Sequence, residues 1–226
     1  MSERKILGLI PARGGSKGIK NKNLYPFNNK PLIQWTIEAA KKSKLLDEII
    51  VSTDDISIAN FAKSMGVKVP YLRDKKLAED NSLIIDTVLD LMEKFYIYED
   101  VLLLQPTSPL RNDIDIQNII NIRNKYDSTS VVSVTLAKEN PALFFNINDN
   151  YYLSKSFENQ EGSNRQNYKK YYILNGALFL SSVKHLKQFK SFISKSTRPY
   201  IMPQERSIDI DYLIDMKWGE FLLKNK

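Results

Sequence analysis

The sequence alternates short apolar runs with segments of helical periodicity, and this rhythm limits the folds open to the chain more than any other feature. Each apolar run ends at a polar or proline-containing loop, which is typical of a buried parallel strand. A chain that repeats strand, loop and helix forms an α/β fold in which right-handed crossovers align the strands. We expect strands at 5–10, 47–52, 67–71, 100–104 and 130–137, and helices at 31–44, 56–65, 82–95 and 113–123.

The carboxyl ends of parallel strands meet at one edge of such a sheet, and ligands of open α/β folds bind in the crevice at that edge. The middle of the chain departs from the rhythm, because strand-like runs at 143–147 and 151–153 are followed by a polar stretch. We expect one domain over residues 1–226 that carries an insertion at about 140–171. A last helix at 212–224 should pack one apolar face on the core, formed by Leu213, Trp218, Phe221 and Leu222.

The composition excludes several classes of protein. With no cysteine, the chain has no disulfide, no thiolate metal site and no cysteine nucleophile, and no apolar stretch approaches the ~20 residues of a membrane span. We therefore expect a cytoplasmic protein without a membrane partner. A net charge of +7, from 33 lysines and arginines against 26 acidic residues, leaves a nucleic-acid-binding protein as one alternative. We favour the other, an enzyme for polyanionic substrates that binds no nucleic acid.

The loop after the first strand has the composition of a phosphate-binding loop. It reads PARGGSKGIKNKN over residues 11–23, with glycines that permit close approach of the backbone and basic side chains that can offset the charge of a triphosphate. It lacks the Walker A and G-x-G-x-x-G spacings, which disfavours a P-loop kinase and a Rossmann dehydrogenase. The alternative is a flexible basic surface loop. Its basic residues are Arg13, Lys17, Lys20 and Lys22.

Two further segments place polar groups at the expected edge of the sheet. Gln105 begins QPTSPLR at the end of an apolar strand, where its amide can donate and accept, although this segment alone would also suit a proline turn. Asp209 and Asp211 alternate in SIDIDYLID, so in an extended chain both carboxylates point the same way and can bind one Mg²⁺. The alternative for these aspartates is capping of the last helix.

Asn175 and Gly176 interrupt a strand-like run, YYILNGALF. Asn-Gly ordinarily forms a hairpin turn, but in a binding site Gly176 would let a substrate approach the backbone and Asn175 would hydrogen-bond it. The single histidine, His185, has neither a cysteine nor a second histidine to act with, and we expect it on the surface of a helix without a role. Hydrolysis by a serine triad is disfavoured because G-x-S-x-G is absent.

Taken in order, these segments resemble the acylneuraminate cytidylyltransferases, the family of CMP-sialic acid synthetases. The resemblance covers about residues 6–220 and is closer than that to the Kdo cytidylyltransferases, which differ in the first loop. It implies a three-layer α/β domain with a mostly parallel sheet, like that of nucleotide-diphospho-sugar transferases. It also implies transfer of CMP from CTP to a sugar acid, with release of pyrophosphate. The matching segments are PARGGSKGIKNKN, IIVSTDD, LRDKKLAEDNS, LLLQPTSPLR, RQ, NGALF and SIDID.

The resemblance assigns roles to individual residues. Some residues match contacts to the CTP phosphates or to cytidine, and others match sugar contacts or metal ligands. Arg13, Lys22 and Asp211 would be catalytic. The nucleotide-binding set is Arg13, Ser16, Lys22, Asn23, Arg73, Asn81 and Ser82; the sugar-binding set, with the interrupted strand included, is Gln105, Arg165, Asn175 and Gly176; and the metal ligands are Asp209 and Asp211.

The resemblance further implies Mg²⁺ or Mn²⁺ as cofactor, and a homodimer in which the insertion offers Arg165 to the carboxylate of the partner's sugar. N-acetylneuraminic acid is the default substrate, with legionaminic acid, pseudaminic acid and Kdo as alternatives. Tyr172, Ile173 and Leu174 occupy a stretch where some members carry a basic residue, which leaves the sugar open. The base that takes the sugar's proton is also open between Asp211 and a metal-bound hydroxide.

Overall fold

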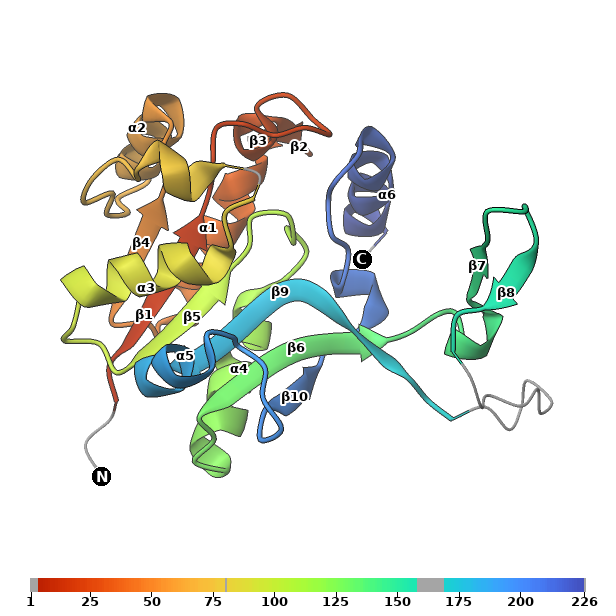
Figure 1. Ribbon diagram of the computed structural model, residues 1–226. Coiled ribbons are helices and arrows are strands. Elements are labelled where there is room, and N and C mark those ends of the chain that lie inside the picture. The colour runs from red at the N-terminus through yellow and green to blue at the C-terminus, as the bar shows by residue number, and fades with distance from the viewer. Residues whose placement is uncertain (1–3, 80, 158–168, 226) are drawn as a thin grey trace.

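A six-stranded sheet forms the centre of the protein, in the order β10-β6-β9-β5-β1-β4. The structure is a computed structural model that describes residues 4–79, 81–157 and 169–225 (Figure 1). Neighbouring strands run parallel except at β9, which is antiparallel to both β5 and β6. The strands are β1 (Ile6–Pro11), β4 (Glu48–Ser52), β5 (Asp100–Leu104), β6 (Ser130–Leu136), β9 (Tyr172–Ser182) and β10 (Arg198–Ile201).

Helices cover both faces of the sheet, so the expected three-layer α/β fold is confirmed. Buried residues of α1 (Leu32–Ser43), α2 (Ile56–Ser64) and α4 (Asp113–Lys125) belong to the core on one face. Those of α3 (Ile84–Lys94) and α5 (Val183–Phe189) belong to the core on the other. The strands feed both cores by alternation: Leu7 and Leu9 join one, Ile6 and Ile10 the other.

The expected strand at 67–71 is wrong, because this segment makes only an isolated bridge from Lys68 to Ile50 of β4. The Lys68 carbonyl accepts one hydrogen bond from the Val51 amide at 2.9 Å. Pro70 follows, and proline has no amide hydrogen with which to extend a ladder. The strand β4 is therefore the edge of the sheet.

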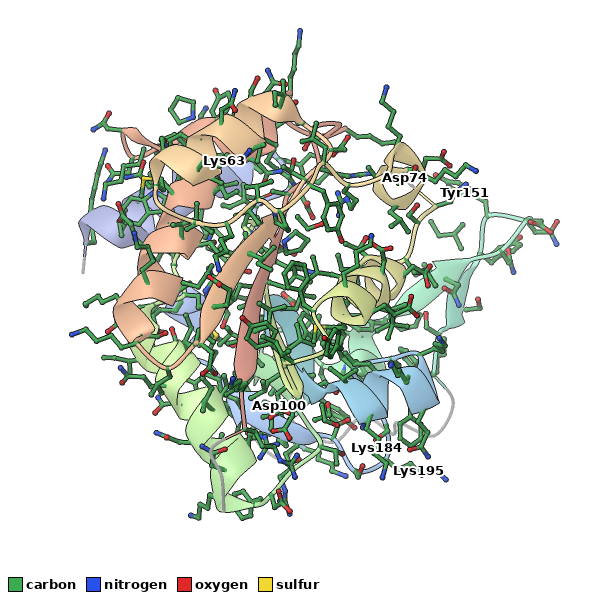
Figure 2. All side chains as sticks on the ribbon, turned by 90° about the vertical axis from the view of Figure 1, so that its left-hand side faces the viewer. Lys63, Asp74, Asp100, Tyr151, Lys184 and Lys195 are labelled. Carbon is green, nitrogen blue, oxygen red and sulfur yellow. The ribbon has the colours of Figure 1, made fainter. Side chains whose placement is uncertain are left out.

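A hairpin of β7 (Phe145–Ile147) and β8 (Leu153–Lys155) projects from the body between β6 and β9 (Figure 1). Figure 2 shows Tyr151, in the turn of this hairpin, at the margin of the molecule. We call residues 140–157 the arm. Its apolar side chains are exposed: Leu143, Phe144, Phe145, Ile147, Tyr151, Tyr152, Leu153 and Phe157.

The last helix, α6 (Leu213–Lys224), packs differently from the expectation. Met216 and Gly219 are buried, and Gly219 lies against the ring of Phe27, so the helix contacts the first loop rather than the central sheet. Trp218 and Phe221 stack on each other at 5.3 Å and both remain about half exposed. Leu213 is exposed as well, whereas Leu222 packs, partly buried, against a core cluster, so the expected packing is wrong for three of the four residues.

Several short elements complete the fold. Among the described residues, no helix combines the length and apolar character that a membrane span requires. The short strands are β2 (Pro26–Phe27) and β3 (Lys30–Pro31), and the 3-10 helices are η1 (Lys22–Leu24), η2 (Lys75–Ala78), η3 (Pro141–Leu143) and η5 (Gln204–Arg206).

Candidate active site

A cavity of about 650 Å³ opens where β1 and β5 end. It brings together segments from the beginning, middle and end of the sequence, as expected for the edge of an open α/β sheet. Eight of the predicted site residues line it. They come from the region after β1, the segments on either side of η2, the loop after β5 and the segment before α6. These are Arg13, Ser16, Lys22, Asn23, Arg73, Ser82, Gln105 and Asp211.

The first loop is held in place by its own polar groups. The buried Asn23 side chain donates a 2.9 Å hydrogen bond to the carbonyl of Arg13, and the Gly14 amide donates to Asp54 at 3.0 Å. Gly18 lies so close to the Asp211 carbonyl that a Cβ atom would clash with it. The glycine therefore lets the loop lie directly against the segment that carries the aspartates.

Lys22 links this loop to the last segment of the chain. Its Nζ atom donates to the carbonyl of Ile210 and to Oδ1 of Asp211, each at 2.9 Å. The Lys22 side chain is mostly buried, whereas that of Asp211 is 62% exposed. The ammonium group of Lys22 is therefore already positioned to bind an anion in the cavity. Lys22 can exchange its exposed partner Asp211 for that anion.

Arg73 also lines the cavity and is almost fully buried. Its guanidinium lies 3.8 Å from Asp54, and Nη1 donates to Thr87 at 3.5 Å. Burial lowers the pKa of Arg73, an effect that the charge of Asp54 opposes. Asp54 thus supports both Arg73 and the Gly14 amide. The sequence analysis assigned Asp54 no role, although its position directly after a strand was a usable signal.

Ser82 and Asn81 lie on the segment that leads into α3. Ser82 lines the cavity, and its hydroxyl donates to the carbonyl of Lys76 in η2. Asn81 precedes it and is exposed. Asp100, labelled in Figure 2, begins β5, whereas the cavity opens beyond the end of that strand at Gln105.

Arg111 is a fully buried residue behind the cavity that the sequence analysis missed. It donates to the carbonyls of Gln105 at 3.2 Å and Ala177 at 3.3 Å, and to the Thr36 hydroxyl at 2.6 Å. Complete burial lowers the pKa of Arg111 to about 10. The guanidinium therefore ties the end of β5 and the middle of β9 to α1. A buried arginine inside a loop motif has no periodicity that would reveal it.

Asp209 and Gly176 face each other beside Gln105. Gly176 has a φ of +73°, and a Cβ atom on it would lie 3.2 Å from Gln105 Oε1 and 3.3 Å from Asp209 Oδ2. Asn175-Gly176 is therefore an irregular point inside β9, where the pairing with β6 shifts register, and not the hairpin turn that the dipeptide ordinarily forms.

The carboxylates of Asp209 and Asp211 interact. Loss of water around its carboxylate raises the pKa of Asp209, and the negative charge of Asp211 adds to this effect. A hydrogen bond with Thr107 opposes it. A cation between the carboxylates would relieve this repulsion.

Three residues from the sequence analysis remain. Asn175 does not line the cavity, because its side chain is buried and its amide bonds to Ser133 and Ser207. Arg165 lies outside the described residues. His185 is 3% exposed, so its expected surface position is wrong. It packs on Phe189 with ring centres 4.7 Å apart, and Nδ1 meets the Thr129 hydroxyl at 3.3 Å.

The aspartates form a donor set that fits a magnesium ion held jointly with phosphates. In the described part of the chain, no group of three or more histidine, cysteine and acidic side chains could hold a metal by itself. Mg²⁺ usually takes one or two carboxylates from a protein when phosphates and water supply the other ligands. Asp211 lines the cavity with Arg13, Lys22 and Arg73, and Asp209 lies near Gly176, which also approaches Gln105. This arrangement suits a metal–triphosphate complex.

Comparisons with known proteins extend this result. Residues 7–218 match the family model described as cytidylyltransferase. The chain is 40% identical over 225 residues to a CMP-N,N'-diacetyllegionaminic acid synthase from Legionella pneumophila, a match that covers 97% of each chain. It is also 34% identical over 214 residues to an N-acylneuraminate cytidylyltransferase from Escherichia coli, covering 94% of this chain and 51% of the relative. The chain thus spans about half the length of that relative.

A solved structure has the same fold. It is that of a CMP:2-keto-3-deoxy-manno-octonic acid synthetase complexed with CTP, with a TM-score of 0.74 at 17% identity, covering 98% of this chain and 99% of that one. At this level of identity the likeness shows the fold alone.

Proposed function

Because the chain belongs to the cytidylyltransferase family, we propose that it transfers CMP from CTP to the anomeric hydroxyl of a nonulosonic acid and releases pyrophosphate. The observation that carries this proposal is the convergence of Arg13, Lys22 and Asp211 on one cavity at the edge of the sheet. In the reaction, a bond forms between the sugar oxygen and the α-phosphorus. The bond from that phosphorus to the bridging oxygen breaks, and pyrophosphate carries its electron pair away.

Each wall of the cavity has a task in this reaction. Arg13 and Lys22 bind the triphosphate and stabilise the charge that develops on pyrophosphate, with Ser16 and Asn23 beside them. Arg73 and Ser82, which also line the cavity, bind cytidine, with Asn81 next to Ser82 in the chain. Gln105, at the end of β5, binds the sugar together with the backbone at Gly176.

Asp209 and Asp211 would hold Mg²⁺ or Mn²⁺ in this proposal. When bound, the metal supplies positive charge to the triphosphate and lowers the pKa of nearby hydroxyl groups. If Asp211 binds the metal, Lys22 would be free to bind the phosphates. This exchange is possible because the ion pair between Lys22 and Asp211 is partly exposed.

The sugar we propose is a legionaminic acid. The synthase that shares 40% identity with this chain matches it over nearly its whole length. The exposed, uncharged side chains of Tyr172, Ile173 and Leu174 also suit a sugar whose far end carries a methyl group and acetamido groups rather than a chain of hydroxyls.

We also propose that the enzyme is a homodimer formed through the arm, in the cytoplasm where CTP is made. The exposed apolar residues of the arm support this, because a projecting hairpin of this composition is stable when a second surface covers it. In such a dimer, Arg165 of the insertion approaches the sugar carboxylate in the partner's cavity.

The experiment that tests this function is release of pyrophosphate by the purified protein with CTP and Mg²⁺. N,N'-diacetyllegionaminic, N-acetylneuraminic, pseudaminic and Kdo acids are offered separately and initial rates are compared. We expect the highest rate with the legionaminic acid. A higher rate with another nonulosonic acid would refute the choice of sugar, and no release with any acid from folded protein would refute the activity.

A further inference from the structure

We propose that Asn175 is a positioning residue, which places the metal-binding carboxylate of Asp209 by holding Ser207. This inference rests on the proposed function, since it concerns the two aspartates as metal ligands. It begins from the side chain of Asn175, which is 5% exposed although it lies next to the cavity. A buried carboxamide that makes hydrogen bonds with good geometry fixes the elements it joins.

Asn175 joins β6, β9 and the last segment of the chain. Its Oδ1 atom accepts from the Ser133 hydroxyl at 2.6 Å and from the Ala177 amide at 3.3 Å. Its Nδ2 group donates to the Ser207 hydroxyl at 2.9 Å and to the sulfur of Met202 at 3.4 Å. The Ala177 amide can only donate, so the oxygen must face it and the nitrogen must face Ser207.

Ser207 and Ile210 fix the backbone on either side of Asp209. The Ser207 hydroxyl, having accepted from Asn175, donates to the carbonyl of Pro203 at 2.8 Å. The Ile210 amide donates to the carbonyl of Thr107 at 2.8 Å. Asp209 lies between these two anchors, so the position of its carboxylate depends on both.

Gly176 provides a second connection from Asn175 to Asp209, through β9. It follows Asn175 directly, and its α-carbon faces Oδ2 of Asp209 closely enough that a Cβ atom would lie 3.3 Å away. Asn175 therefore fixes two elements. One is β9, against which Asp209 lies, and the other is the turn of residues 203–207, which leads into Asp209. Without the bond from Asn175 to Ser207, Asp209 can shift relative to Asp211, which is anchored separately because its amide donates to Asp215 Oδ2 at 2.9 Å.

The turn itself does not depend on Asn175 for its folding. Arg206, next to Ser207, donates to the fully buried Asp115 through Nε at 3.0 Å and Nη2 at 2.9 Å. This buried, bidentate pair holds η5 on α4 independently. Loss of the Asn175 bond should therefore leave the fold intact and change only the local position of Asp209.

Binding of Mn²⁺ to the protein with CTP and without sugar tests this proposal, followed by the electron paramagnetic resonance signal of free Mn²⁺. Supporting residues of metal ligands contribute about 10-fold to 100-fold in metal affinity. We expect Asn175→Ala and Ser207→Ala each to weaken Mn²⁺ binding at least about tenfold. The double variant should be no weaker than the single ones, because both remove the same interaction.

Two variants serve as controls. Gln204→Ala removes a 2.9 Å hydrogen bond from the same turn to the carbonyl of Leu136, without touching Asn175, and should bind Mn²⁺ like the wild type. Ser207→Thr keeps the hydroxyl and should do the same. Because Ser207 is half-buried, Ser207→Ala should fold, and it tests the proposal if Asn175→Ala does not fold.

The outcomes separate this inference from the function on which it rests. Wild-type affinity in the folded Ser207→Ala variant, or additive losses in the double variant, would overturn the positioning role alone. Failure of the wild-type protein with CTP to retain Mn²⁺ would overturn the proposed metal site and this inference with it.

Discussion

Replacement of Gly176 by alanine separates backbone strain from damage to the site. At a φ of +73°, an alanine in the left-handed region costs about 1–2 kcal/mol. For a chain of this length, 1 kcal/mol corresponds to about 2–4 °C in Tm, so we expect Gly176→Ala to lower the Tm by about 2–8 °C.

The effect on turnover should be much larger than this strain. The new Cβ atom would lie 3.2 Å from Gln105 Oε1 and 3.3 Å from Asp209 Oδ2, and both are ends of side chains that can move aside. They move at the point where the sugar and the metal are bound. Misplacement of catalytic groups by a fraction of an ångström to an ångström costs about 10-fold to 100-fold in rate, so we expect that loss in kcat/KM.

Gly66→Ala is the matched control. Gly66 has a φ of +71° and ends α2 far from the cavity, and the nearest atom to a new Cβ would be Lys41 Nζ at 3.5 Å. It should lose a similar amount of Tm and keep wild-type pyrophosphate release. Equal rates in the two folded variants would refute the claim that the surface at Gly176 belongs to the site.

Three further predictions concern other parts of the chain. Lys22→Gln should lower kcat about 100-fold in the pyrophosphate assay, while Lys20→Gln, in the same loop but outside the cavity lining, should not; equal effects would argue against a role for Lys22 in transfer. Arg123→Leu leaves the buried Asp100 without its partner at 2.7 Å, so urea unfolding should show a loss of about 3–5 kcal/mol with CTP binding unchanged. Burial lowers the pKa of His185, so the unfolded chain binds its proton more tightly and stability falls as the pH drops below about 6.5. Urea unfolding at pH 7.5 and 5.5 should show a smaller acid loss in His185→Asn, and an equal loss would contradict this.

The strands and helices around the sheet could be predicted because burial on two faces leaves a pattern in the sequence. The strand from Asp100 to Leu104 is entirely buried, which explains the continuous apolar run that follows Asp100. The segment at 67–71 has similar side chains, but strand formation depends on a partner, and only Lys68 reaches one. Propensity alone carries no information about that partner.

The lining of the cavity was predictable where motifs follow strands, and less so for residues buried beneath it. Lys22, Gln105 and Asp211 were found because charged and polar groups in loops after strands converge at one edge. Arg111 was missed because its importance comes from burial beneath that edge. The exposed face of α6 was misjudged because an amphipathic pattern does not say which surface covers it.

The reversed direction of β9 has a consequence for how such an enzyme can diversify. Since β9 enters the sheet at the edge where its neighbours end, the chain that precedes it, including the arm, joins the body at that edge. Arg111 and Ser133 hold β9 after this entry point, through Ala177 and Leu178. The arm can therefore change in length and in side chains while both helical layers keep their packing.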